Sequence, residues 1–147
     1  MSQFKTILVA IDLSEDSTHV ANRAMAVAAN NGAEVHMIHV IEPLSFAYGG
    51  DIPMDFSGIQ DEIHQQAKQQ LTRFAQALGI PEERQHLLLG KPEVEIHATA
   101  EKLGIDLIVL GSHGRSGLAL LMGSTANGVL HGAGCDVLAV RVGKEQA

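Results

Sequence analysis

The sequence predicts an α/β protein built on a single doubly wound, five-stranded parallel sheet of order 3-2-1-4-5, a Rossmann-like arrangement with helices on both faces. Apolar runs of strand length alternate with helix-length amphipathic stretches along all 147 residues. Strands that alternate with helices pair in parallel through right-handed crossovers. No internal repeat or linker divides the chain, so we expect one domain over 1–147 with a frayed tail at 143–147.

Five apolar runs supply the strands, and a polar residue or a glycine follows each run and ends it. From the N-terminus they are Ile7–Ile11, Val35–Ile41, His86–Leu89, Asp106–Leu110 and Cys135–Val142. The continuous apolar character of the first run, without alternation, indicates a strand that is buried on both faces of the sheet.

The first helix is expected directly after the first strand. Ser14 is a suitable N-cap, and Glu15 and Asp16 would lie in the positive first turn of the helix. Asn31 and Gly32 are typical of a helix end.

The remaining helices carry similar signals. Apolar residues spaced by three and four predict a helix over 59–78. Pro92 opens the next helix, which ends at Gly104, and Ser124 caps the last one. Prolines and glycines within 43–56 predict a long loop before the second helix.

Composition restricts the classes of function. Ten Lys and Arg against 17 Asp and Glu give a formal net charge of −7, and only 3% of the residues are aromatic. A nucleic-acid partner is not expected, because binding to a phosphate backbone normally needs a basic face. No apolar run reaches the roughly 18 residues of a membrane span, and no N-terminal stretch resembles a signal peptide. We therefore expect a cytoplasmic protein that does not contact a membrane.

Glycine is concentrated in one part of the chain. Eight of the 15 glycines fall within residues 104–134, a segment whose only charged residues are Asp106 and Arg115. The centre of this segment is a glycine-rich loop over 111–123 that leads into the last helix. This loop is therefore the first candidate for a functional site.

The loop has the features of an anion-binding site. Glycines let backbone N–H groups approach a phosphate, and the following helix N-terminus adds its dipole. Ser124 and Thr125 can donate hydroxyl hydrogen bonds, Arg115 supplies a cation, and His113 can contact phosphate. The plain alternative is that the glycines only make tight turns. Neither a Walker loop nor a Gly-x-Gly-x-x-Gly after the first strand is present, so neither ATP hydrolysis by that machinery nor NAD binding is indicated.

Topology is expected to bring a carboxylate to the same place. In a sheet of this order, ligands bind beyond the carboxyl ends of the strands, between strands one and four, where the winding reverses. Asp12 ends the first strand and Gly111 ends the fourth, so we expect them to converge. Asp12 can then hydrogen-bond a ribose or hold a divalent cation. Alternatively, it is a turn residue that precedes the Ser14 cap.

The eight histidines do not form a metal-binding pattern. His36 and His39 are three apart on a strand and therefore face opposite sides. Those expected singly on the surface or against helices are His19, His64, His86, His97 and His131. Cys135, the single cysteine, rules out an internal disulfide and is expected to be an inert core thiol. We find no Ser-His-Asp set or carboxylate pair that indicates a hydrolase.

Several of these motifs together resemble the universal stress protein family. The resemblance rests on the opening strand and turn Lys5–Ser14, the second strand His39–Glu42, the loop Asp106–Gly117 with Gly123–Thr125, and the closing strand Cys135–Arg141. It spans essentially the whole chain as one universal stress protein domain. It implies an α/β fold of the kind derived above, a homodimer, and a cytoplasmic role in survival under stress.

The resemblance also implies a nucleotide site. In the ATP-binding branch the signature is Gly, two residues, Gly, nine residues, Gly and then Ser or Thr. By that pattern the loop would hold phosphates and ribose, while Asp12 and Val40 would border the adenosine. Together with the other loop and strand-end residues, the expected binding residues are Ala10, Ile11, Asp12, Val40, Gly111, Ser112, His113, Gly114, Arg115, Gly123, Ser124 and Thr125. The implied cofactor is ATP, alone or with Mg²⁺ or Mn²⁺, and we expect neither a catalytic residue nor a metal site made by the protein alone.

The loop departs from the family signature in its length. Eight residues, rather than nine, separate Gly114 from Gly123. The other branch of the family has lost the glycines and is not expected to bind ATP, whereas this chain keeps them with a shorter spacer. The shorter loop either adjusts locally or moves Gly123 and Ser124 away from the phosphates.

Three hypotheses follow from the sequence. The first is a homodimeric universal stress protein that binds an adenine nucleotide as a regulatory ligand and is not an enzyme, slow ATP hydrolysis aside. The second is a dimeric member of the same family that binds no nucleotide and acts through protein partners. The third is a nucleotide-dependent hydrolase or transferase on the same fold. For the dimer, we expect the apolar edge strand Val137–Val142 to pair with its copy across a two-fold axis.

Overall fold

Five parallel strands form the centre of the molecule in the order β3-β2-β1-β4-β5, so the predicted sheet is confirmed. The computed structural model describes residues 3–43, 57–112 and 124–142. The strands are β1 (Thr6–Ala10), β2 (Glu34–Ile41), β3 (Gln85–Leu89), β4 (Leu107–Gly111) and β5 (Asp136–Val140). The register places Ile7 of β1 opposite Val35 of β2 and Leu107 of β4.

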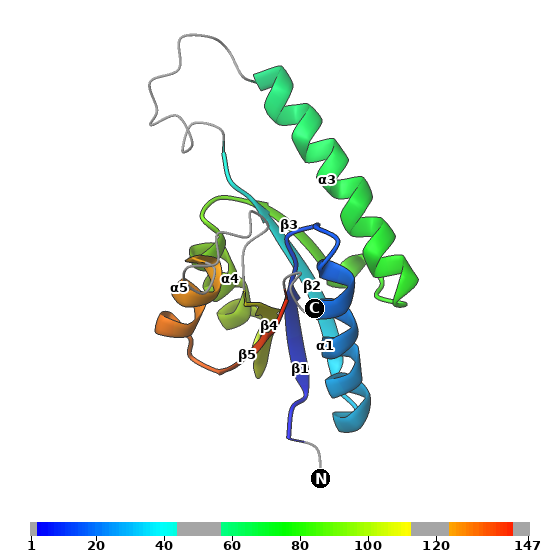
Figure 1. Ribbon diagram of the computed structural model, residues 1–147, viewed down its shortest axis with the longest axis vertical. Coiled ribbons are helices and arrows are strands. Elements are labelled where there is room, and N and C mark those ends of the chain that lie inside the picture. The colour runs from blue at the N-terminus through cyan, green and yellow to red at the C-terminus, as the bar shows by residue number, and fades with distance from the viewer. Residues whose placement is uncertain (1–2, 44–56, 113–123, 143–147) are drawn as a thin grey trace.

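Two of the described helices cover each face of this sheet (Figure 1). Helices α1 (Ser17–Asn31) and α3 (Ser57–Ala77) lie on one face, and α4 (Pro92–Leu103) and α5 (Ser124–Gly132) lie on the other. A short 3-10 turn, Glu82–Arg84, precedes β3. The predicted layers are therefore confirmed. None of the helices in the described ranges is both long and apolar enough to cross a membrane.

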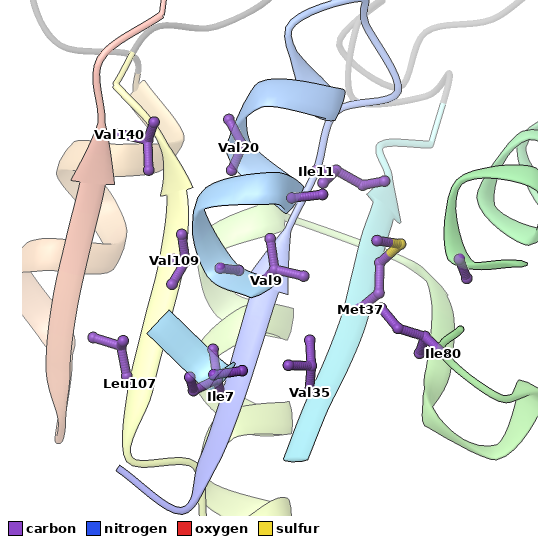
Figure 2. Packing of buried hydrophobic residues seen from close by; sticks show 14 of the residues in the cluster. Ile7, Val9, Ile11, Val20, Val35, Met37, Ile80, Leu107, Val109 and Val140 are labelled. Carbon is purple, nitrogen blue, oxygen red and sulfur yellow. The ribbon is translucent and has the colours of Figure 1, made fainter. Parts of the chain in front are cut away.

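The central strand is apolar because both of its faces are buried. Ile7 and Val9 of β1 point toward α1, where they pack with Met37 and Val109 of the neighbouring strands (Figure 2). Leu8 belongs to the core on the opposite face, under α4 and α5. All three β1 side chains are at most 1% exposed. A run without a polar position thus occupies the middle of the sheet, as its place in the strand order requires.

The first helix begins later than predicted. Helix α1 starts at Ser17, and the N-cap position is held by Asp16, whose side chain makes no capping hydrogen bond. The predicted cap, Ser14, instead belongs to the preceding turn: its N–H and hydroxyl donate to Oδ1 of Asp12, at 3.0 and 2.6 Å, and its hydroxyl oxygen accepts the N–H of Asp16 at 3.3 Å. Leu13 between them has a positive φ of 64°, a conformation that costs a non-glycine residue about 1 kcal/mol or more. The carboxylate therefore organises a turn, and the acidic residues predicted for the first helical turn precede the helix.

Two predicted helix ends are confirmed at glycines. Gly32 and Gly104 adopt the left-handed conformation, with φ of 64° and 67°, and their N–H groups donate to carbonyls in the preceding turn. The last strand is shorter than predicted, since β5 stops at Val140, where its pairing with β4 ends. The other strand and helix bounds lie within two residues of the prediction. The predicted loop after Pro43 and the tail at 143–147 lie outside the described residues.

Helix α5 packs closely on α4. An added Cβ at Gly128 would lie 2.9 Å from Cβ of Glu93, and one at Gly132 would lie 2.6 Å from the imidazole of His97. The same imidazole donates from Nε2 to the carbonyl of Val129, 2.9 Å away. Glycines on α5 and a histidine on α4 thus fix the two helices against each other, and the expectation that His97 packs against a helix is confirmed.

Candidate functional site

A cavity of about 680 Å³ opens at the carboxyl ends of β1, β2 and β4. Its wall also includes the N-terminal turns of α1, α4 and α5 and the middle of α3. The winding of the sheet reverses between β1 and β4, which is where ligands bind in doubly wound sheets. Three helix N-termini at one cavity place partial positive charge around it.

Six of the predicted binding residues line this cavity: Ala10, Ile11, Asp12, Val40, Gly111 and Thr125. Asp12 and Gly111, which lie far apart in the sequence, converge there as expected. Ser112 is described but is not part of the wall. Its N–H donates to the Val140 carbonyl at 2.9 Å, and its hydroxyl accepts a bond from the Val142 N–H at 3.4 Å. Ser112 therefore joins the chain that follows β4 to the end of β5 and to Val142.

The other predicted binding residues lie at or beyond the limits of the described ranges. His113, Gly114, Arg115 and Gly123 are outside them. Ser124 is the first residue of α5, and its side chain is not described. Gly111 and Thr125, which flank the loop in the sequence, both line the cavity.

Asp12 is held in place by its own turn. Its Oδ1 accepts three hydrogen bonds, two from Ser14 and one from the buried hydroxyl of Ser17, 3.1 Å away. Among the described residues, no hydrogen bond is made to Oδ2. Asp12 is therefore a turn residue, which is the alternative that the sequence predicted. Its second carboxylate oxygen remains available to a ligand hydroxyl or a cation.

Nothing in the described protein requires a glycine at position 111. Its φ is not in the left-handed region, and an added Cβ would make ordinary contacts of 3.4 Å with Val20 and Val142. Both valines line the cavity, so this Cβ would lie in the cavity wall. A ligand that approaches the main chain here would explain the glycine, whereas a tight turn would not.

The structure adds residues that the sequence did not single out as ligands. His39 and Glu42 come from the end of β2, and Ile63, Gln66 and Gln70 come from α3. The signal for the first two was available, because the last residues of a strand next to the switch point border the crevice. The α3 residues carry no such signal, since the part of a helix that reaches a cavity depends on tertiary packing.

The described cavity wall is acidic. Asp12, Asp16 and Glu42 contribute carboxylates, and neither lysine nor arginine is among the lining residues that the structure describes. Within the described ranges, no group of three or more His, Cys, Asp or Glu residues is arranged to hold a metal ion. A divalent cation at Asp12 would therefore need oxygen ligands from a bound phosphate or from water.

A second polar feature lies away from the cavity, on β2 and β3. His36 Nδ1 and His86 Nε2 are 3.0 Å apart, and the two rings are inclined by 21°. His36 is only 8% exposed, and burial lowers the pKa of both imidazoles. His86, which was expected to stand alone, therefore has a partner on the neighbouring strand. The strand register brings the two together, and helical spacing gives no sign of it.

Cys135 has the properties of an unreactive thiol. It forms no disulfide and is partly buried, and burial together with the charges of Asp136 and Asp106 raises its pKa. A raised pKa keeps the thiol protonated at neutral pH, which agrees with the prediction from the sequence.

Comparisons with known proteins converge on one family. The sequence model of the universal stress protein family matches residues 3–141. Universal stress protein A homolog 1 of Coxiella burnetii is 48% identical over 139 residues, which cover 93% of this chain and 96% of the relative. Among solved structures, the hypothetical protein MJ0577 is similar with a TM-score of 0.79 at 25% identity, over 96% of this chain and 98% of that one.

A second solved structure is a universal stress protein in complex with cAMP. It is similar with a TM-score of 0.63 at 25% identity, over 95% of this chain and 98% of that chain. The family match, the identity to the Coxiella relative and the shared fold all extend over nearly the whole sequence. This chain belongs to the universal stress protein family.

Proposed function

We propose that this protein binds an adenine nucleotide as a regulatory ligand in the cavity at the carboxyl ends of β1, β2 and β4. The observation that carries the proposal is the meeting of Asp12, Val40 and Gly111 at that cavity. Three separate segments supply these residues, and each offers a group suited to a different part of a nucleotide. The related protein in complex with cAMP adds support for an adenine ligand.

The base and the ribose fit the side of the cavity formed by β1 and β2. Val40 lies near the end of β2, and its main-chain N–H and C=O are on the side that faces β1. Such a donor and acceptor can pair with N1 and N6 of adenine. Ile38 and Ile96 supply apolar surface for the ring. The second carboxylate oxygen of Asp12 can accept a hydrogen bond from a ribose hydroxyl.

The phosphates fit the side formed by β4 and α5. Gly111 leaves room for an anion beside the main chain, and the first turn of α5 with Thr125 offers N–H and hydroxyl donors. Because Asp12, Asp16 and Glu42 make the described wall acidic, ATP should bind more tightly with Mg²⁺ or Mn²⁺ than alone. A singly charged nucleotide such as cAMP should depend less on the cation.

We propose a regulatory role for the nucleotide without enzymatic turnover, so that any ATP hydrolysis would be slow and incidental. A second candidate is a member of the family that binds no nucleotide and acts through protein partners. The eight-residue spacer favours this candidate, because a shorter loop could hold Gly123 and Ser124 away from the phosphates. A hydrolase or transferase, in contrast, would need steady turnover that a change at Asp12 removes.

We further propose that the protein is a cytoplasmic homodimer joined through β5. This strand lies at an edge of the sheet, and Val137, Leu138 and Ala139 are only partly buried there. An apolar edge strand promotes uncontrolled association unless it is covered. Pairing with the same strand of a second copy across a two-fold axis would cover it.

Ligand release and titration test the proposed function. Purified protein is denatured, and small molecules set free are identified by absorbance and mass spectrometry. Calorimetric titration with ATP, ATP plus Mg²⁺, and cAMP then compares wild type with Asp12→Asn, which keeps the Oδ1 acceptor of the turn but replaces the other oxygen by a donor. We expect binding to weaken by about tenfold or more. Asp61→Asn, at an exposed position on α3, is the matched control and should bind as wild type does.

The predicted loop provides an independent test. The new side chain in Gly114→Val should block the approach of an anion to the main chain and abolish binding without unfolding the protein. Retained affinity in this variant would show that the loop does not contact the nucleotide. If wild-type protein releases no nucleotide and does not bind added nucleotide, the second candidate is favoured.

A further inference from the structure

The main-chain pairing between β1 and β2 stops at the cavity. Its last hydrogen bond runs from the Ile11 N–H to the carbonyl of Ile38, over 3.0 Å. Residues two apart in a strand turn their main-chain groups to the same side, so the N–H and C=O of Val40 also face β1. The intervening residues face β3, as the bond of 2.9 Å from the Gly90 N–H to the Ile41 carbonyl shows.

A histidine takes the place of the next bond in this ladder. Continued pairing would join the Val40 N–H to the Ile11 carbonyl, but Nδ1 of His39 lies 2.8 Å from that carbonyl oxygen. A carbonyl can only accept, so Nδ1 carries the proton and donates it. Among the main-chain hydrogen bonds of the described residues, none joins Val40 to β1. The chain also turns away here, since Leu13 has a positive φ.

We propose that His39 is a positioning residue that keeps the main-chain edge of Val40 available to a ligand. While the imidazole holds the Ile11 carbonyl, the N–H and C=O of Val40 remain a donor beside an acceptor in the cavity wall. This pair matches a heteroaromatic ring that carries an acceptor nitrogen next to an amino group, as adenine does. The identity of the ligand rests on the proposed function, whereas the state of the Val40 edge does not.

Amide hydrogen exchange of the ligand-free protein, followed by NMR, tests the state of this edge. In His39→Leu the Ile11 carbonyl loses its donor and pairs with the Val40 N–H, so exchange at Val40 should slow about five- to tenfold, the effect of one hydrogen bond. His39→Asn places its amide nitrogen where Nδ1 stood and should keep the wild-type exchange rate. Equal exchange in wild type and His39→Leu, or a wild-type Val40 amide as protected as that of Ile38, overturns the inference.

Calorimetric titration with cAMP and with ATP plus Mg²⁺ tests the consequence for binding. We expect His39→Leu to weaken binding by about tenfold and His39→Asn to restore it to within about threefold of wild type. Gln85→Leu is the control, because Gln85 also donates from its side chain to a main-chain carbonyl, that of Ile80 at 2.9 Å, but does not line the cavity. This variant should bind as wild type does.

Each outcome separates the inference from its rivals. If the role of His39 is purely structural, His39→Leu would lower the free energy of unfolding and leave exchange at Val40 unchanged. Unchanged affinity in His39→Leu, with slowed exchange at Val40, would overturn the positioning role. If wild type binds neither nucleotide, the proposed function fails, while the exchange rates still decide whether His39 keeps the Val40 edge open.

Discussion

His36 on β2 and His86 on β3 share a hydrogen bond of 3.0 Å between Nδ1 of the first and Nε2 of the second. Charged groups surround this pair. Glu34 lies 3.6 Å from Nε2 of His36, Arg84 lies 3.3 Å from Glu34, and the charge of Lys102 on α4 acts on His86. One ring must donate and the other accept, so the bond requires at least one of the two imidazoles to be neutral.

We expect this pair to make the fold sensitive to mild acid. Burial lowers the pKa of both histidines, and the charges of His36 and Lys102 lower that of His86 further. The unfolded chain therefore takes up protons first. The stabilisation is present above the unfolded pKa of about 6.5 and is lost as the pH falls below it. Each proton contributes a slope of at most about 1.4 kcal/mol per pH unit.

Urea unfolding between about pH 5 and pH 8 measures this dependence. The double variant His36→Phe/His86→Leu should show a flatter dependence of the free energy of unfolding on pH. His64→Gln, at an exposed position on α3, should keep the wild-type slope. A wild-type slope in the double variant would mean that other groups determine the response to acid.

Gly128→Ala is expected to destabilise the protein although alanine is the better helix former. In an exposed helix this change normally raises stability by about 1 kcal/mol, but here the new Cβ would lie 2.9 Å from Cβ of Glu93. We expect the free energy of unfolding to fall by about 1–3 kcal/mol. Gly134→Ala, where nothing lies within 4 Å of an added Cβ, should change it by less than about 0.5 kcal/mol. Equal effects of the two changes would contradict the close packing of α5 on α4.

Gly111→Ala should separate a binding role of this residue from a structural one. The new methyl group makes ordinary contacts with Val20 and Val142, so the free energy of unfolding should change by less than about 1 kcal/mol. The same group lies in the cavity wall and should weaken nucleotide binding by about tenfold. Urea unfolding gives the first quantity and calorimetry the second. Unchanged affinity would indicate that the ligand does not approach the main chain at this position.

Ala139→Pro should convert the proposed dimer into a folded monomer. The Val140 carbonyl accepts the Ser112 N–H at 2.9 Å and so faces β4, which means that the Ala139 N–H faces the open edge. Proline there removes a donor from the edge without breaking the pairing of β4 with β5. Leu138→Pro, whose missing N–H would face β4, should instead cost about 3 kcal/mol. Light scattering gives the molecular mass, and a dimeric Ala139→Pro variant would place the interface elsewhere.

Most of the element bounds could be predicted because they depend on signals that are local in sequence, and the strand order followed from the alternation of strands with helices, which is typical of a doubly wound sheet. The run Ile7–Ile11 has no polar position, which places it inside a sheet covered on both faces, and glycines at 32 and 104 end helices where predicted. The convergence of Asp12 and Gly111 followed from the strand order alone.

The features that the sequence did not predict depend on competition between local structures or on the register of distant strands. Ser14 could cap a helix or join a turn with Asp12, and the sequence does not show that this turn delays the start of the helix to Ser17. The pairing of His36 with His86 joins positions 50 residues apart on different strands, which no spacing rule connects. The role of His39 depends on the point at which β1 leaves the sheet.

The turn at Asp12 uses one carboxylate oxygen and leaves the other for the proposed ligand. Ser14 and Ser17 hold Oδ1 through three hydrogen bonds, so this side chain is ordered during folding and needs little further ordering when a ligand meets Oδ2. Ser14 does not itself line the described cavity wall. If the proposed ligand binds here, changes at Ser14 would alter how long it stays bound through the rigidity of the acceptor, without altering the contact itself.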